Sequence, residues 1–437
     1  MQKRLLTIAV LSVIASSPAL AQYATNQVGQ ANSRGKLAIS QDFSSVRNNP
    51  ASAAWISPAE TTFDYNIFGP IGAGYEVGKI DSLLDELDEL IDILEQDDLS
   101  AQDALDAKER FDPFLVDAAV DGRVKAFGYA SIPLFPMYFR AKDEHIIYAD
   151  FHVGGSLRAT VIDDEIDIVG FNDTFAINTD AAVYVKSMGL ISVGLGYATQ
   201  VWEYNDAQVF AGVKANINRF SLAKNIISLA GLEDGEDIGD AIEDDYENNA
   251  NASFNLGLDV GIEWVEPKYQ LGLSITDINE PDYDYGSLVS DCSGLTGISL
   301  DNCIVSQNAI AAGRIRGEET YTATAQATLS GSYKIGNGYG VLLGGSVDIN
   351  EKNDPIGDPY QWFHVSATTF FDKAWVPELR FGYSENMAGS ELSFYSVGFT
   401  LFERASLDVS WSDEKVEIDD SEAPRSALLS FSIQSKF

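Results

Sequence analysis

The chain has 437 residues, of which 45% are hydrophobic and 22% charged. Its 28 Lys and Arg residues face 66 Asp and Glu residues, so the net charge is −38 at pH 7. An acidic excess of this size argues against nucleic acid as a partner, because phosphates bind Lys and Arg. Beyond the first residues no stretch reaches the roughly 18 consecutive apolar residues of a transmembrane helix.

Residues 1–21 are predicted to be a signal peptide. Lys3 and Arg4 precede an apolar run, Leu5–Ile14, which is too short to span a bilayer as a helix. Ala19-Leu20-Ala21 then supplies an A-x-A cleavage pattern. We expect an exported chain whose mature form begins at Gln22, in preference to an ordinary buried helix.

Two acidic segments, at about 79–119 and 222–247, are predicted to form helical inserts. In the first, apolar residues recur at helical spacing with Asp and Glu on the opposite face: Ile80, Leu83, Leu84, Leu87, Leu90, Ile91 and Leu94. We expect both inserts to pack on or inside the rest of the fold. The alternative is that they form a binding surface for another envelope protein.

Period-two alternation dominates the rest of the chain. In Ser253–Val265 one face carries Phe254, Leu256, Leu258, Val260, Ile262 and Trp264, and the other carries small or polar residues. Similar runs cover 145–161, 191–203, 208–221 and 320–335. They exceed the usual five or six residues of a globular strand and suit tilted membrane strands of about nine to eleven. A soluble sandwich alternates too, but the small polar face favours a wet lumen.

The connections between these strands alternate in length. Short ones are expected at 204–207, 266–267, 336–339, 372–376 and 403–404; long ones are expected at 222–252, 278–319, 351–360, 386–392 and 413–425. A short turn expected at 188–190 breaks the rule. Bacterial barrels have short periplasmic turns and longer external loops. We therefore predict an all-β fold: a transmembrane antiparallel barrel of about 14 strands spanning 58–437.

Few residues suggest a catalytic, metal-binding or cofactor-binding site. Cys292 and Cys303 are predicted to form a disulfide rather than a catalytic site. His145, His152 and His364 are isolated from one another, and no serine has a nearby histidine, so we predict no enzyme, no metal site and no cofactor. Carboxylates in predicted external loops indicate a solvated acidic rim, which could hold divalent cations that bridge lipopolysaccharide phosphates: Asp282, Asp284, Asp348, Asp354 and Asp358.

The last strand carries the most specific pattern. Phe431, Ile433 and Phe437 occupy one face, while Ser432, Gln434 and Lys436 occupy the other. A final strand that ends in Phe resembles the signal read by the barrel-assembly machinery. Together with the signal peptide it predicts the outer membrane of a Gram-negative bacterium, in contact with lipid and lipopolysaccharide.

The stretch Asn48-Asn49-Pro50-Ala51, followed by small residues, resembles the plug region of long-chain fatty-acid transporter-like barrels. It is still more similar to a group known as conjugal transfer protein TraF, in which such a stretch precedes an acidic Leu-rich helix and a barrel. The resemblance implies that residues 22–57 form a plug. A helix start with Pro at its first turn is an alternative that agrees with a plug.

Two functions agree with these features. The first is passive passage of small hydrophobic solutes through a plugged barrel. The second is a non-conducting scaffold that docks a secretion or conjugation assembly through the acidic helices.

Overall fold

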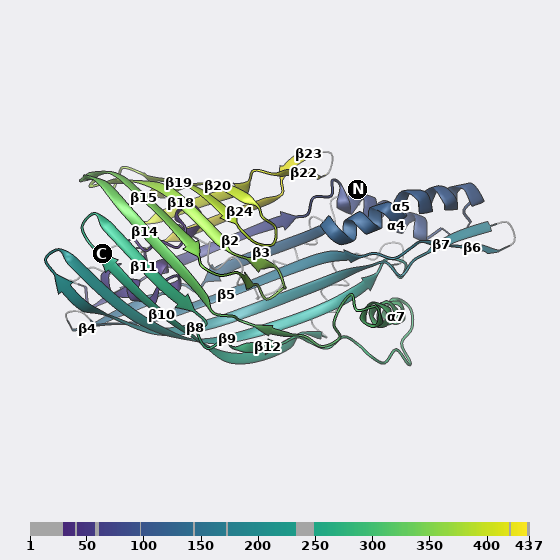
Figure 1. Ribbon diagram of the computed structural model, residues 1–437, viewed down its shortest axis with the longest axis horizontal. Helices are drawn as coiled ribbons and strands as arrows, with labels where there is room; N and C mark the ends of the chain where they lie inside the picture. The colour runs from purple at the N-terminus through teal and green to yellow at the C-terminus, as the bar shows by residue number, and fades with distance from the viewer. Residues whose placement is uncertain are drawn as a thin grey trace.

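The computed structural model describes residues 29–39, 42–56, 61–96, 98–142, 145–171, 174–232, 249–418 and 421–434. The predicted signal peptide and Phe437 lie outside these residues. The fold is an elongated barrel with helices and hairpins gathered at one end (Figure 1).

The barrel wall is one antiparallel sheet, closed by the pairing of β5 with β8. β1 pairs with β4, and β2 pairs with β3. β1 and β2 are therefore two parts of one interrupted wall strand, and β3 and β4 are two parts of another. The wall therefore has 14 strands, which confirms the predicted barrel. Their bounds are β1 Phe63–Tyr65, β2 Phe68–Val77, β3 Arg123–Ser131, β4 Met137–Lys142, β5 His145–Ile162, β8 Ala182–Tyr204, β9 Ala207–Ser228, β10 Asn251–Val265, β11 Tyr269–Thr276, β14 Gln326–Asn337, β15 Tyr339–Asp348, β18 Trp362–Phe371, β19 Glu378–Asn386, β20 Ser393–Leu401, β21 Ala405–Ser412 and β24 Ser426–Ile433.

The wall is inside out relative to a soluble protein. On β10, Phe254 and Trp264 are 68% and 46% exposed, whereas Asp259 and Glu263 are 5% and 1% exposed. The same pattern continues to β24, where Phe431 and Leu429 point outward and Ser430 and Ser432 are buried. Apolar residues facing outward and polar residues facing a lumen are typical of a membrane barrel.

The two ends of the barrel differ. The connections at 205–206, 266–268, 338, 372–377 and 402–404 lie at one end, together with the end of β24; we call this the short-turn end. All the longer connections lie at the other, the long-loop end. They include three small hairpins: β12 (Asp282–Asp284) with β13 (Thr320–Thr322), β16 (Lys352–Asn353) with β17 (Pro359–Tyr360), and β22 (Lys415–Ile418) with β23 (Ser421–Pro424).

β5, β8 and β9 have 18, 23 and 22 residues and extend beyond the other strands at the long-loop end (Figure 1). Helices α4 (Leu83–Leu94) and α5 (Ala101–Asp121) and the hairpin β6 (Asp167–Phe171)–β7 (Thr174–Asn178) pack against these extensions. Leu90, Phe111 and Leu115 are fully buried in this second core. None of the helices among the described residues combines the length and apolarity needed to cross a membrane.

Three segments differ from the prediction. The turn expected at 188–190 does not exist, because β8 continues through it with Gly189 paired to Gly155 and Ser221. Residues 222–228 of the second helical insert belong to strand β9, and 233–247 lie outside the described residues. Conversely, helix α7 (Ile298–Ala311) occupies the connection at 278–319, where no helix was predicted.

Candidate functional site: the closed lumen

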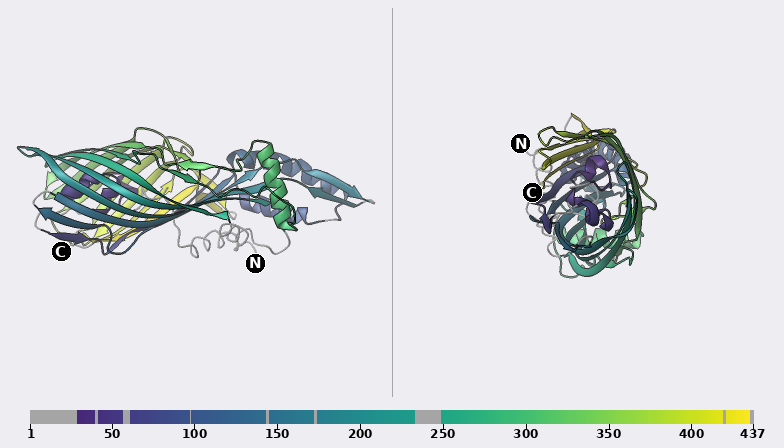
Figure 2. Two further views of the ribbon diagram at one scale, coloured as in Figure 1. Left: turned by 90° about the horizontal axis from the view of Figure 1, so that it is seen from below. Right: turned by 90° about the vertical axis from the view of Figure 1, so that its left-hand side faces the viewer.

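The N-terminal segment, residues 29–39 and 42–56, lies inside the barrel (Figure 2, right). It consists of short helices: α2 Ala31–Arg34, η3 Phe43–Arg47, η4 Pro50–Ser52 and α3 Ala53–Ile56. α2 contacts β18, β19 and β21, whereas η4 contacts β8, β9 and β10 on the opposite side of the ring. The segment therefore crosses the lumen from wall to wall.

The Asn-Pro-Ala stretch packs against two glycines of the barrel wall. Asn49 has an extended backbone and its side chain accepts a hydrogen bond from the Ala51 amide at 3.0 Å, with Pro50 at the first helical position. A Cβ on Gly261 would overlap Asn49 Oδ1, and one on Gly212 would overlap the Pro50 carbonyl carbon. The Asn49 side chain approaches Gly261 closely, and the Pro50–Ala51 backbone approaches Gly212 closely, so both wall positions require glycine.

Arg47 holds the segment to the wall at β5. Its guanidinium reaches Asp150 with a closest distance of 2.6 Å, and the Asp150 side chain is completely buried. Lys214 Nζ and His152 Nδ1 lie 3.4 and 3.1 Å from the same carboxylate. Arg47 also donates to Ser131 at 2.7 Å. A carboxylate buried to this degree needs cationic partners such as Arg47 and Lys214 to remain ionised.

Further charged contacts fix the other half of the segment. Lys36 Nζ lies 2.5 Å from Asp348 on β15, and Ser33 donates to Asp408, which also binds Arg380 at 3.0 Å. Within the segment, Arg34 pairs with Asp42 at 2.9 Å. Asp348 is 1% exposed, so its placement in a solvated rim was wrong.

A second closure lies nearer the long-loop end, where residues 352–358 fold inward. Lys125 of β3 binds Asp354 at 2.6 Å and Asp358 at 2.8 Å, and Arg158 of β5 binds Asp358 at 2.9 Å. Burial alone would raise the pKa of Asp358, but the charges of Lys125 and Arg158 hold that pKa below its ordinary value. Asp354 and Asp358 are thus internal ion-pair partners, not rim carboxylates as predicted.

Between these carboxylates Ile356 is fully buried in an apolar cluster. The cluster joins wall residues to the loops that fold over them, and the Phe220 and Tyr283 rings are 4.3 Å apart. Its members are Phe127, Tyr129, Met188, Leu190, Phe220, Leu222, Tyr283, Tyr285, Tyr321, Ala323, Ile356 and Leu428. The lumen therefore has a charged closure at the N-terminal segment and an apolar closure beneath the long loops.

The remaining predicted residues are spread over the molecule. Cys292 and Cys303 form a disulfide, as predicted, between the start of the long connection and α7. Asp282 and Asp284 are exposed on β12. His145 is exposed near Tyr197, and His364 is buried beside Gly35. Within the described part of the chain, no three His, Cys, Asp or Glu side chains cluster as a metal site would require.

Sequence reasoning missed the ion pairs that fix the N-terminal segment. A signal for them exists: Arg34, Lys36 and Arg47 are the three basic residues of 22–57, in a chain with a large acidic excess. The partners stand on distant strands and cannot be assigned from spacing.

This geometry defines a class of protein: a closed, 14-stranded antiparallel barrel of the outer-membrane type, whose lumen is occupied by its own N-terminal segment. The chain belongs to the family described as "F plasmid transfer operon, TraF, protein", whose model matches residues 46–348. No curated protein matches the chain significantly.

Solved structures with a similar fold include a Pseudomonas aeruginosa FadL homologue, which is 13% identical, with 95% of this chain and 97% of that chain covered and a TM-score of 0.44. The Ralstonia pickettii toluene transporter TbuX is 12% identical, with 95% and 100% covered and a TM-score of 0.44. The P. putida toluene transporter TodX is 12% identical, with 91% and 95% covered and a TM-score of 0.38.

Proposed function

We propose that this protein is a barrel of the Gram-negative outer membrane that passes small hydrophobic solutes passively, with the N-terminal segment as its plug. The short-turn end would face the periplasm and the long-loop end the exterior. The outward apolar residues of strands such as β10 support a lipid-facing wall.

The observation that carries the proposal is the pair of closures within one lumen. The N-terminal segment is attached through side-chain ion pairs and hydrogen bonds, which can break one by one, and not through strand pairing with the wall. The inward loop is likewise held by Lys125 and Arg158. The apolar cluster that the inward loop joins through Ile356 suits a hydrophobic solute better than an ion.

Planar-bilayer recording and solute-uptake assays test the proposal on four proteins: the unaltered chain, one lacking residues 29–56, one with 353–358 replaced by Gly and Ser, and one with both changes. We expect little conductance from the first protein and the largest from the last. A gel-shift on heating shows whether each barrel is folded. If the doubly altered barrel is folded but passes neither ions nor solute, passage is refuted.

A docking scaffold is the second candidate, and the family's link to plasmid transfer agrees with it. The observation in its favour is the outer surface of α5, where Leu105, Val116 and Val120 are 48%, 53% and 79% exposed on one helix face beside acidic residues. Among the acidic residues of α4, Glu86 and Glu89 bind Arg110 of α5.

Charge reversal of Asp85, Glu86, Asp88 and Glu89 would therefore also disturb the packing of α4 on α5. A cleaner test replaces Val116 and Val120 with Asp. A scaffold should then lose co-purifying envelope proteins while the barrel stays folded, whereas a channel should keep its conductance and solute passage unchanged.

A further inference from the structure

A row of four basic residues crosses neighbouring strands near the long-loop end. Lys125 on β3 is directly opposite Arg158 on β5, Arg158 is opposite Lys186 on β8, and Lys186 is opposite Lys224 on β9. Directly opposed residues of an antiparallel pair point to the same face, so the four side chains share one side of the sheet. We call these residues the cationic row.

Such a row requires compensation, because like charges directly opposite each other destabilise a sheet. The loops supply part of it: Asp354 and Asp358 bind Lys125, and Glu319 binds Lys186 at 2.5 Å. Lys224 Nζ donates to the backbone carbonyl of Arg316 at 2.7 Å. Only 28 of the 437 residues are basic, so four in adjoining register form a marked local concentration.

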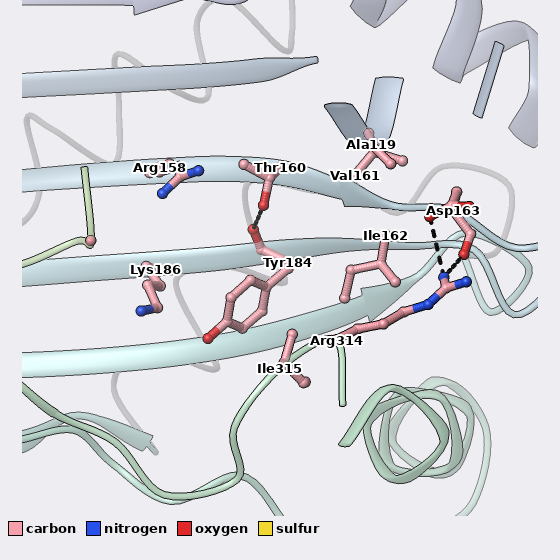
Figure 3. Close-up of a pocket in the computed structure, with 11 residues that line it drawn as sticks. Ala119, Arg158, Thr160, Val161, Ile162, Asp163, Tyr184, Lys186, Arg314 and Ile315 are labelled. Carbon is pink, nitrogen blue, oxygen red and sulfur yellow. Dashed lines mark hydrogen bonds and ion pairs between the residues drawn. The ribbon is translucent and has the colours of Figure 1, made fainter. Parts of the chain in front are cut away.

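A cavity of about 440 Å³ lies directly beside the row (Figure 3). Arg158 and Lys186 line one part of it, while Val161, Ile162 and Ile315 line another. Tyr184 stands between the two parts (Figure 3). The volume lies within the usual range of about 300–1,000 Å³ for small-molecule sites. The lining thus combines Arg158 and Lys186 with an apolar surface, beside which Arg314 is paired with Asp163 at 3.3 Å.

Arg158 has a hydrogen-bond donor that its ion pair with Asp358 does not use. Nη1 binds Asp358 at 2.9 Å, but the buried Nε has no hydrogen-bond partner among the residues that the structure describes. Gly357 lies next to both cations: a Cβ there would be 3.4 Å from Lys186 Nζ and 3.9 Å from Arg158 Nη1. The inward loop therefore ends at the cavity, within reach of an anion bound between the two side chains.

We propose that this cavity binds a small organic anion, with its carboxylate or phosphate group between Arg158 and Lys186 and its apolar body against Ile162 and Ile315. The anion competes with Asp358 for Arg158 and so weakens the attachment of the inward loop. This inference rests on the proposed function, since it gives the class of solute that enters the barrel: a hydrophobic molecule with one acidic group.

Equilibrium binding to the folded, detergent-solubilised full chain tests the site without requiring passage. The probes are benzoate, its neutral relative benzamide, phenyl phosphate and inorganic phosphate, all at neutral pH. We expect saturable binding of benzoate and phenyl phosphate. Lys186→Met and Arg158→Met should each weaken it at least about tenfold, since a charge-assisted hydrogen bond is lost. Arg110→Met, which removes an exposed arginine of α5, should leave binding unchanged.

Equal binding of benzoate and benzamide would overturn the assignment, because the cations would then contribute nothing. Inorganic phosphate binding without the aromatic acids would overturn the apolar half of the site. Lys186→Met keeps the test valid if Arg158→Met fails to fold. If the full chain binds benzoate but the folded, doubly altered barrel passes neither ions nor solute, the site is retained and passage is refuted. If that barrel passes solute but the full chain does not bind benzoate, passage is retained and the site is refuted.

Discussion

Replacing Arg47 with Met should loosen the N-terminal segment while leaving the barrel wall intact. The change removes three contacts to Asp150, at 2.6, 3.0 and 3.1 Å, and the hydrogen bond to Ser131. Breaking a buried ion pair costs about 3–5 kcal/mol. Since Lys214 and His152 remain near Asp150, we expect the lower end, about 3 kcal/mol.

A loss of about 3 kcal/mol multiplies the undocked population of the segment by roughly 100, because each 1.4 kcal/mol is a factor of ten. Amide hydrogen exchange of peptides covering 42–56 should accelerate by about that factor, while peptides of β19–β21 keep their protection. Arg110→Met is the matched control: its ion pairs are exposed and are worth at most about 1 kcal/mol. Exchange of 42–56 within a factor of two of the parent chain would refute the assigned role of Arg47.

Three further changes address other parts of the structure. Gly261→Ala places a methyl group against Asn49 and should displace the Asn-Pro-Ala stretch, seen as faster exchange of 48–54. Lys125→Met leaves two buried carboxylates without their shared cation and should expose residues 352–358 to limited proteolysis. Acidification of the parent chain should expose the same residues as the pH falls through the lowered pKa of Asp358. A carboxylate whose pKa is lowered on folding stabilises the folded state only above that pKa. Cys292→Ser should lower the stability of the α7 connection by about 3 kcal/mol without affecting the heat-modifiable barrel.

Controls for these changes come from the same chain. Among the described residues, a methyl group at Gly317 meets the Ile310 side chain alone, at 3.3 Å, so Gly317→Ala should leave exchange of 48–54 unaltered. Lys415→Met removes an exposed pair on β22 and should not affect proteolysis of 352–358. An unchanged cleavage pattern in Lys125→Met would contradict the anchoring role of that lysine. A Cys292→Ser chain that no longer forms a heat-modifiable barrel would contradict the view that the disulfide acts locally.

The sequence predicts the wall where one face is polar and the other meets lipid, as on β10. It fails where the inward face is apolar. Met188 and Leu190 face inward and are 2% and 1% exposed because they join the apolar cluster. The alternation of polar and apolar residues is therefore absent there, and the sequence wrongly predicts a turn at 188–190. In residues 222–228 all side chains are buried, since β9 extends into the second core, and the period-two pattern is lost.

The lumen contents were less predictable than the wall. The Asn-Pro-Ala stretch could be recognised, but the glycines that it packs against, Gly212 on β9 and Gly261 on β10, could not be predicted. Each of these glycines also suits an ordinary strand. The ion pairs of Arg47 and Lys36 join residues 103 and 312 positions apart in the chain. One sequence carries no signal for pairing over such separations. The placement of Asp354 and Asp358 failed for the same reason, as their partner lies on β3.

The two closures are built from different residues, and this separates two models of opening. If passage requires both the N-terminal segment and the inward loop to be displaced, their opening probabilities multiply, and the effects of Arg47→Met and Lys125→Met add as free energies. With about 3 kcal/mol each, the double variant should open roughly 10,000 times more often than the parent chain, against about 100 times for either single variant. Single-channel recording measures the frequency of openings directly. If the double variant opens no more often than the two single variants taken together, release of either closure alone is enough for opening, and the barriers do not act in series.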